Sequence, residues 1–167
     1  VLVDRLRNPA DEYVERDEDL SVDEAEKIGL ILHARYCTEV SPRYTFRAVE
    51  METVPMIIDC GNGILVRMTG TMDRSRVKVG QEGIGIADLK SGARAVEKGA
   101  AKTKGHGAQV GTYEMLFEHS TGDQITEPAE IIGLKTGGKP EIATGEIRNA
   151  KRLMVGTPER SEERRVG

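Results

Sequence analysis

The chain has 167 residues, of which 38% are hydrophobic and 31% are charged, and its formal net charge is −4. These values suit one globular domain and exclude a chain that is disordered throughout, because disorder combines low hydrophobicity with high net charge. The sequence also lacks an apolar run long enough for a membrane helix, has only two cysteines and is 4% aromatic, which argues against a membrane protein, a disulfide scaffold and a base-stacking protein.

The two ends of the chain differ from the rest. Residues 1–26 contain ten acids and three arginines, a charge of −7, so the remaining residues sum to +3. We expect residues 1–20 to be an acidic, partly mobile leader and residues 21–159 to be the domain. Truncation at both ends is expected, because the chain begins with Val rather than Met and ends in an unusual segment. Residues 160–167 (RSEERRVG) are similar to a translated sequencing adapter, and an ordinary charged tail is the alternative.

A helix is the first predicted element. Ser21 and Glu24 have the spacing of a capping box at a helix N-terminus. Apolar residues then recur at spacings of three and four as far as Val40, which indicates an amphipathic helix. Ser41-Pro42 is expected to end it, because the residue before proline avoids the helical conformation.

The sequence between residues 44 and 90 is typical of β-strands. Cys60-Gly61-Asn62-Gly63 is a strong turn, since Asn and Gly accept positive φ angles. The predicted strands are Tyr44–Glu52, Val54–Asp59 as its continuation or partner, Ile64–Met72 as the return strand, and Ile84–Lys90, which Ser91-Gly92 ends.

The remaining sequence predicts a loop, two helices and one more strand. In order these are a Gly- and Lys-rich loop over residues 93–107, a helix from Ala108 to His119, a strand from Ala129 to Lys135 and the start of a helix over Ile147–Val155. Together the elements predict an α/β (α+β) sandwich, in which helices flank a mixed central sheet that is mostly antiparallel with one crossover.

Asp88 and Lys90 stand two residues apart in the predicted strand Ile84–Lys90, so their side chains project from the same face. Taken alone, the pair is more typical of a solvent-facing ion pair than of a catalytic site. If the strands pair through the turn at 79–83, however, Asp73 comes close to Asp88, and adjacent carboxylates repel unless a cation lies between them. Carboxylate oxygens suit Mg²⁺ or Mn²⁺, which leaves Lys90 to stabilise charge on a phosphate.

Three motifs in order, Gly70-x-x-Asp73, Asp88-x-Lys90 and Gln109-x-x-x-Tyr113, resemble the PD-(D/E)XK nuclease superfamily, and more narrowly its RecB-type exonuclease branch with its phage and prophage members. The resemblance spans about Tyr44 to Thr136. It implies a restriction-endonuclease-like fold and a metal-dependent DNA nuclease, of exonuclease type, that acts in phage recombination or DNA repair. A catalytically silent nuclease-like module for DNA binding or assembly is the alternative.

The resemblance also implies roles for individual residues. Asp73, Asp88 and the main-chain carbonyl of Leu89 would ligate Mg²⁺ or Mn²⁺, and Lys90 would be the catalytic lysine. Gln109 and Tyr113 would contact DNA or brace the site, and Arg74 would pair with a carboxylate or a phosphate. The basic residues of the loop would offer phosphate contacts, unless the loop is simply solvated. These residues are Lys98, Lys102, Lys104 and His106.

A further metal ligand is expected on the first helix in this family. Gly29-x-x-x-His33 matches one form of that motif, although His33 is equally interpreted as a helix-surface histidine. Glu50 and Glu52 are other candidates, or the solvent face of an edge strand. Two separated cysteines argue against an iron–sulfur cluster, which needs four.

The resemblance implies DNA as the binding partner. It leaves room for a recombination partner protein and for an oligomer, and no membrane association is expected. Because the sequence lacks a secretory signal and its two cysteines suit a reducing compartment, we expect a cytoplasmic protein of a bacterium or a phage-infected cell.

Overall fold

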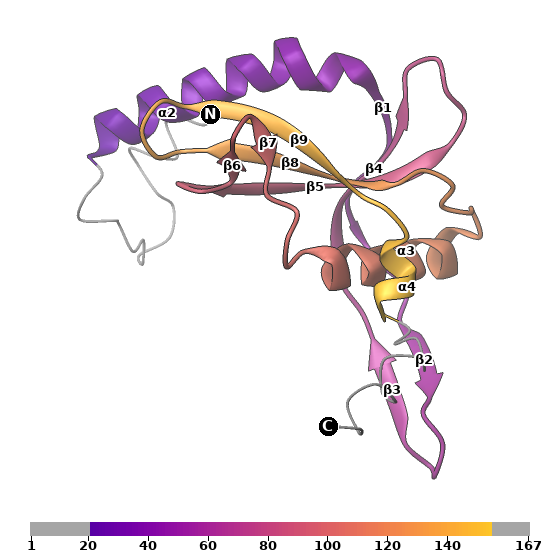
Figure 1. Ribbon diagram of the computed structural model, residues 1–167. Helices are drawn as coiled ribbons and strands as arrows, with labels where there is room; N and C mark the ends of the chain where they lie inside the picture. The colour runs from indigo at the N-terminus through magenta and orange to yellow at the C-terminus, as the bar shows by residue number, and fades with distance from the viewer. Residues whose placement is uncertain (1–20, 155–167) are drawn as a thin grey trace, which may run out of the picture.

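The computed structural model describes residues 21–154 and shows a central sheet with helices on both faces (Figure 1). The helices are α2 (Val22–Arg35), continued by a π-helical segment (Tyr36–Val40) and a 3₁₀ turn (Ser41–Arg43), α3 (Gly107–Thr121) and α4 (Ala150–Met154). The strands are β1 (Tyr44–Glu52), β2 (Met56–Asp59), β3 (Leu65–Met68), β4 (Thr71–Lys78), β5 (Ile84–Gly92), β6 (Val96–Glu97), β7 (Ala100–Ala101), β8 (Ala129–Lys135) and β9 (Glu141–Ile147).

The central sheet has five strands in the order β1-β4-β5-β8-β9. Neighbouring strands are antiparallel except for β5 and β8, which are parallel. A parallel pair needs a crossover connection, and α3 lies in the connection between these two strands. The predicted mixed sheet with one crossover is therefore confirmed.

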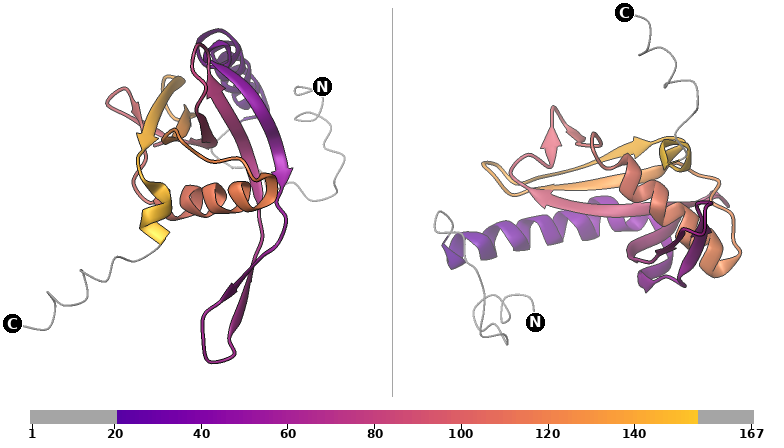
Figure 2. Two further views of the ribbon diagram at one scale, coloured as in Figure 1. Left: turned by 90° about the vertical axis from the view of Figure 1, so that its right-hand side faces the viewer. Right: turned by 90° about the horizontal axis from the view of Figure 1, so that it is seen from below.

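The helices cover opposite faces of this sheet (Figure 2). On one face Ile86 of β5 packs in a buried cluster with Val110 and Phe117 of α3. On the other face Ala87 packs with Val40, which ends the helical segment that continues α2. Because successive strand residues alternate between faces, Asp88 projects toward the α3 side and Leu89 toward the α2 side.

The first helix begins as predicted. The Ser21 hydroxyl accepts a hydrogen bond from the backbone N–H of Glu24, and the Ser21 backbone N–H donates to the Glu24 carboxylate, so both halves of the capping box are present. The helical chain continues to Val40 by changing from α- to π-helical hydrogen bonding at Tyr36. No helix in the described residues is both long and apolar enough to span a membrane.

The predicted return strand Ile64–Met72 is wrong as a single strand. The chain divides at Thr69-Gly70 into β3, which pairs with β2, and β4, which joins the sheet beside β1. At this point the Thr53 backbone and hydroxyl hydrogen-bond to Gly70, across the base of the β2–β3 pair. Strands β2 and β3 consequently form a separate two-stranded arm that projects from the body (Figures 1 and 2).

The predictions for the C-terminal half need four further corrections. Strand β5 continues through Ser91 to Gly92, because pairing with β8 extends that far. The expected loop at 93–107 contains the short hairpin β6–β7, and residues 141–147, for which no strand was predicted, form the edge strand β9. The final helix begins at Ala150 rather than Ile147. The predicted leader (1–20) and tail (160–167) lie outside the described residues.

Candidate active site

The two predicted acids lie on neighbouring strands, where the ladder between β4 and β5 ends. The last residues in the register are Arg74 and Ala87, so Asp73 and Asp88 are the next opposing positions. The Asp73 carboxylate accepts a hydrogen bond of 2.9 Å from the backbone N–H of Leu89. Asp73 therefore holds the backbone that joins Asp88 to Lys90.

Asp88 is almost completely enclosed, with 1% of its surface exposed. Its Oδ2 lies 2.7 Å from Lys90 Nζ, and its Oδ1 is buried with no hydrogen-bond partner in the described part of the chain. Burial raises the pKa of the Asp88 carboxyl and Asp73 raises it further, whereas the Lys90 ammonium and His106 act in the opposite direction. A buried, partly unsatisfied carboxylate beside a lysine is the environment that an oxygen-seeking cation would complete.

Helix α3 brings Gln109 and Tyr113 together, as their spacing of four predicts. Gln109 Nε2 donates a hydrogen bond of 3.2 Å to the Tyr113 hydroxyl. The Tyr113 ring packs against Gly70, where an added Cβ would lie 3.3 Å from the ring. The pair consequently sits beside the start of β4, three residues before Asp73.

His106 belongs to this group, although the sequence indicated only a phosphate contact in a loop. It is the N-cap residue of α3, and its charge acts on the Asp88 carboxyl. The spacing of His106, Gln109 and Tyr113 in the sequence is the signal that places His106 with the other two residues. Positions i, i+3 and i+7 share one helix face, so the placement of all three residues on one face was predictable.

Arg74 and His33 lie on the opposite, α2 side of the sheet. The Arg74 guanidinium stacks over the rings of Tyr36 and Phe46, at 5.3 and 5.6 Å from the ring centroids, and its Nη1 is buried with no hydrogen-bond partner among residues 21–154. His33 is exposed, lies 3.7 Å from the Cys37 sulfur and lines a cavity of about 360 Å³ together with Arg74 and Leu89. The structure does not bring His33 into contact with the two aspartates.

Within residues 21–154 no three His, Cys, Asp or Glu side chains gather in a way that would hold a metal ion. The register also aligns Glu50 with Asp73, since Val49 pairs with Arg74 and Met51 with Met72. Glu50 nevertheless has a positive φ of 47° and is exposed. The donors that fit a hard divalent cation are therefore the carboxylates of Asp73 and Asp88, with the adjacent main-chain carbonyl of Leu89 as a predicted third.

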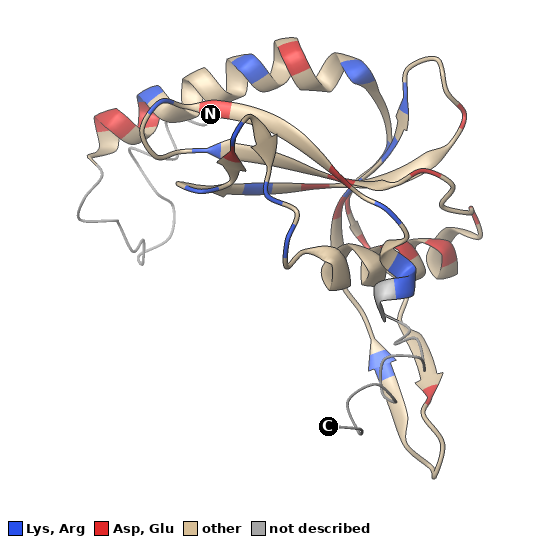
Figure 3. Cartoon of the chain, viewed as in Figure 1, with Lys and Arg blue, Asp and Glu red and all other residues tan. Residues whose placement is uncertain are grey.

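Basic residues lie in the β6–β7 hairpin and in the connection from β7 to α3 (Figure 3). Lys98, Lys102 and Lys104 are all exposed, and they precede the helix that carries His106 and Gln109. Exposed lysines beside a site of this kind are suited to contact phosphates, because their flexible ammonium groups act as point charges.

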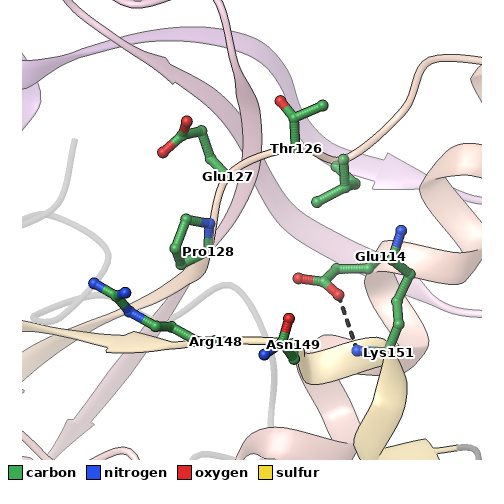
Figure 4. A pocket seen from close by; sticks show the side chains of 8 residues that line it. Glu114, Thr126, Glu127, Pro128, Arg148, Asn149 and Lys151 are labelled. Carbon is green, nitrogen blue, oxygen red and sulfur yellow. Dashed lines mark hydrogen bonds between the residues drawn. The ribbon is translucent and has the colours of Figure 1, made fainter.

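A separate polar cavity of about 300 Å³ contains none of the predicted site residues (Figure 4). Glu114 of α3, which is 3% exposed, points across it and accepts a hydrogen bond of 3.1 Å from the backbone N–H of Lys151. Burial raises the pKa of the Glu114 carboxyl. Glu114 thereby joins α3 to the first turn of α4, which is a structural role.

Comparison with known proteins identifies the class to which this fold and site belong. The family model described as the PD-(D/E)XK nuclease superfamily matches residues 3–164. The match covers nearly the whole sequence, and the chain belongs to this superfamily. The mixed sheet between two helical layers is accordingly the restriction-endonuclease-like fold that the motifs implied.

One solved structure, named "Putative exonuclease" and obtained from Eubacterium rectale, is similar to this chain with 18% sequence identity and a TM-score of 0.49. The similarity covers 90% of this chain and 55% of the other, so the chain spans little more than half the length of that protein. No match was found among the curated proteins.

Proposed function

We propose that the chain is a Mg²⁺- or Mn²⁺-dependent deoxyribonuclease that hydrolyses phosphodiester bonds at Asp73, Asp88 and Lys90. One observation carries the proposal: Asp88 is buried beside Lys90 with a carboxylate oxygen that has no partner in the described residues, and Asp73 supports the backbone between them. Membership of the nuclease superfamily supports phosphodiester hydrolysis as the reaction class.

The residues of the site have separate tasks in this mechanism. Asp73, Asp88 and the Leu89 carbonyl would hold the cation, which when bound lowers the pKa of a water molecule and neutralises phosphate charge. Lys90 compensates the Asp88 charge at 2.7 Å and is positioned to stabilise the negative charge that builds on the phosphate. Gln109, Tyr113, Arg74 and Lys104 are proposed to contact the DNA backbone or brace the site, and His33 is retained as a lower-ranked ligand.

The biological assignment is part of the proposal and rests on the ordered motifs of the RecB-type branch. We place the protein among exonucleases of phage recombination or bacterial DNA repair, with DNA as its substrate. Two free, exposed cysteines, Cys37 and Cys60, accord with a reducing cytoplasm. A recombination partner protein and an oligomeric form remain part of the same proposal.

The test is degradation of linear single- and double-stranded DNA with Mg²⁺, with Mn²⁺ and with a chelator. Asp88→Ala and Lys90→Ala should each lower the rate at least about 100-fold, because each removes a preorganised charge from the reaction centre. Asp123→Ala and Lys78→Ala are matched controls, since these residues form ion pairs elsewhere with Arg47 and Glu146.

The catalytically silent module is the second candidate, and the lack of a three-ligand group among residues 21–154 favours it. It predicts that wild type and all four variants bind DNA but are equally inert with either metal. That result would replace the enzyme assignment by a DNA-binding or assembly role.

A further inference from the structure

The arm, defined as residues 53–70 with β2, β3 and their turn, carries much of the exposed apolar surface of the molecule. Among the described residues nine large hydrophobic side chains are exposed. Five of them belong to the arm: Val54, Ile57, Ile64, Leu65 and Val66. Contiguous apolar surface of this kind marks a binding site, and a two-stranded ribbon gains stability when it is covered.

One face of the arm is entirely apolar. Met56 pairs with Met68 and Ile58 with Val66, and residues opposite each other in an antiparallel ladder share a face. The other face carries Ile57 and Leu65 together with the only charged residues of the arm, Asp59 and Arg67. The apolar face therefore offers no group that would bind a phosphate.

The base of the arm is held firmly. The Thr53 backbone N–H and hydroxyl both donate to the Gly70 carbonyl, at 3.0 and 2.9 Å, and the Gly70 N–H donates to the Thr53 hydroxyl. The arm is also bonded to the body, because the Val54 N–H donates a hydrogen bond of 2.9 Å to the Ser120 hydroxyl near the end of α3. These bonds fix the direction in which the arm leaves the body.

The arm is also continuous with the candidate active site. Gly70 packs on Tyr113, and the chain reaches Asp73 three residues later. The arm extends about 25 Å from this base, at roughly 3.3 Å per residue. The exposed Lys102 and Lys104 precede the same helix at its other end.

We propose that the arm is a wedge that enters the end of a DNA duplex and separates its strands. Apolar side chains insert between base pairs and unstack them. The apolar face carries four, of which Val66 is exposed and Met56, Ile58 and Met68 are half-buried. Lys102 and Lys104 would contact the phosphates of the duplex, so that one separated strand is led to Lys90. This inference rests on the proposed nuclease function, and its substrate class is duplex DNA with an accessible end.

A readout without catalysis tests strand separation directly. A duplex with 2-aminopurine in its terminal base pairs is mixed with Asp88→Asn protein in the presence of a chelator. Unstacking raises the fluorescence, and we expect a rise that Ile58→Ser/Val66→Ser, which alters one cross-strand pair of the apolar face, reduces at least fivefold. Val79→Ser is the control, because Val79 is also an exposed hydrophobic residue but lies in the turn between β4 and β5, and it should leave the rise unchanged.

Cleavage rates then separate this inference from the proposed function. With Asp88 intact, the double variant should degrade single-stranded DNA within twofold of wild type and blunt duplex at least tenfold more slowly. Equal losses on both substrates would overturn the wedge, as would an unchanged fluorescence rise in the double variant. If wild type cleaves neither substrate, the nuclease assignment fails, while the fluorescence still reports on the arm.

Sedimentation of the same proteins tests a second copy of the chain as the occupant of the arm. The wedge predicts that wild type and the double variant have the same oligomeric state in solution. A wild-type oligomer that the double variant dissociates would overturn the wedge and assign the arm to self-association.

Discussion

Asp88 is buried, yet its Oδ1 lacks a hydrogen-bond partner in the described part of the chain. An unsatisfied buried carboxylate oxygen costs free energy that a bound cation would recover. We therefore expect Mn²⁺ to raise the thermal unfolding midpoint, with a stabilisation of about 2.7 kcal/mol when the free metal is at 100 times its dissociation constant. Differential scanning calorimetry with and without the metal measures this.

Asp88→Asn should abolish the Mn²⁺-dependent rise, whereas Asp123→Asn, which alters an exposed aspartate, should retain it. An equal rise in wild type and Asp88→Asn would mean that the metal binds elsewhere.

Glu114 provides a pH-dependent prediction, because burial raises the pKa of its carboxyl in the folded state. A raised folded-state pKa means that the stability contributed by the neutral form is present at low pH and is lost as the pH rises through that pKa. Glu114→Gln avoids this loss of stability, because a glutamine side chain does not ionise. The variant should therefore gain stability relative to wild type as the pH rises from 4 to 8, as thermal unfolding midpoints at each pH will show.

Glu146→Gln is the control with the opposite sign. A hydrogen bond from Lys78 lowers the pKa of the Glu146 carboxyl, so its stabilising contribution appears as the pH rises. This variant should lose stability relative to wild type over the same pH range. Parallel trends for the two variants would contradict the assignment.

At the scale of elements, a buried polar cluster ties three strands of the sheet together. Arg76 of β4 is fully buried, lies 3.3 Å from the Glu130 carboxylate of β8 and stacks over Tyr44 of β1, whose hydroxyl donates to the same carboxylate. Arg76 lies close to β5 at Gly85, where an added Cβ would be 2.9 Å from its Nη1.

We expect Arg76→Met to lower the free energy of unfolding by about 3–5 kcal/mol, because it leaves the Glu130 charge buried and uncompensated. Denaturant titration measures the change. Arg76→Met/Glu130→Leu removes both charges and should recover most of the loss. If the double variant is no more stable than Arg76→Met, the loss comes from packing rather than from the orphaned charge.

At the scale of the whole molecule, the arm is separate from both buried clusters. Neither cluster includes a residue of β2 or β3. Replacing residues 56–68 by a short Gly/Ser turn should therefore move the unfolding midpoint by no more than about 3 °C, the shift expected for roughly 1 kcal/mol in a domain of this size. Thermal unfolding followed by circular dichroism checks this.

Replacing Val96–Ala101 is the contrasting change. Val96 and Ala101 of the β6–β7 hairpin are buried, and Gly133 of β8 packs closely against both. This replacement should lower the midpoint clearly. If the two replacements have the same effect, the arm is part of the core after all.

Local signals determined much of this protein. The capping box at Ser21, the amphipathic spacing up to Val40 and the turn at Cys60–Gly63 were predictable, because each depends on neighbouring residues alone. The D-x-K spacing placed Asp88 and Lys90 on one strand face, and the Gln109–Tyr113 spacing predicted their contact. Strand β9 escaped prediction because its Ala, Thr and Gly residues give little hydrophobic alternation; its strand conformation comes from pairing with β8.

Tertiary structure decided what depends on partners distant in sequence. One apparent strand is split at Gly70 into an arm strand, which pairs with β2, and a sheet strand, which pairs with β1. Gly70 itself hydrogen-bonds to Thr53 across the base of the arm. Packing of α3 against β5 buries Asp88 and leaves its oxygen unsatisfied, whereas the position of α2 puts His33 on the other face. The sequence thus indicated which residues are candidates for the chemistry, while the contacts between elements decided which of them meet, because burial and proximity arise only when distant segments pack together.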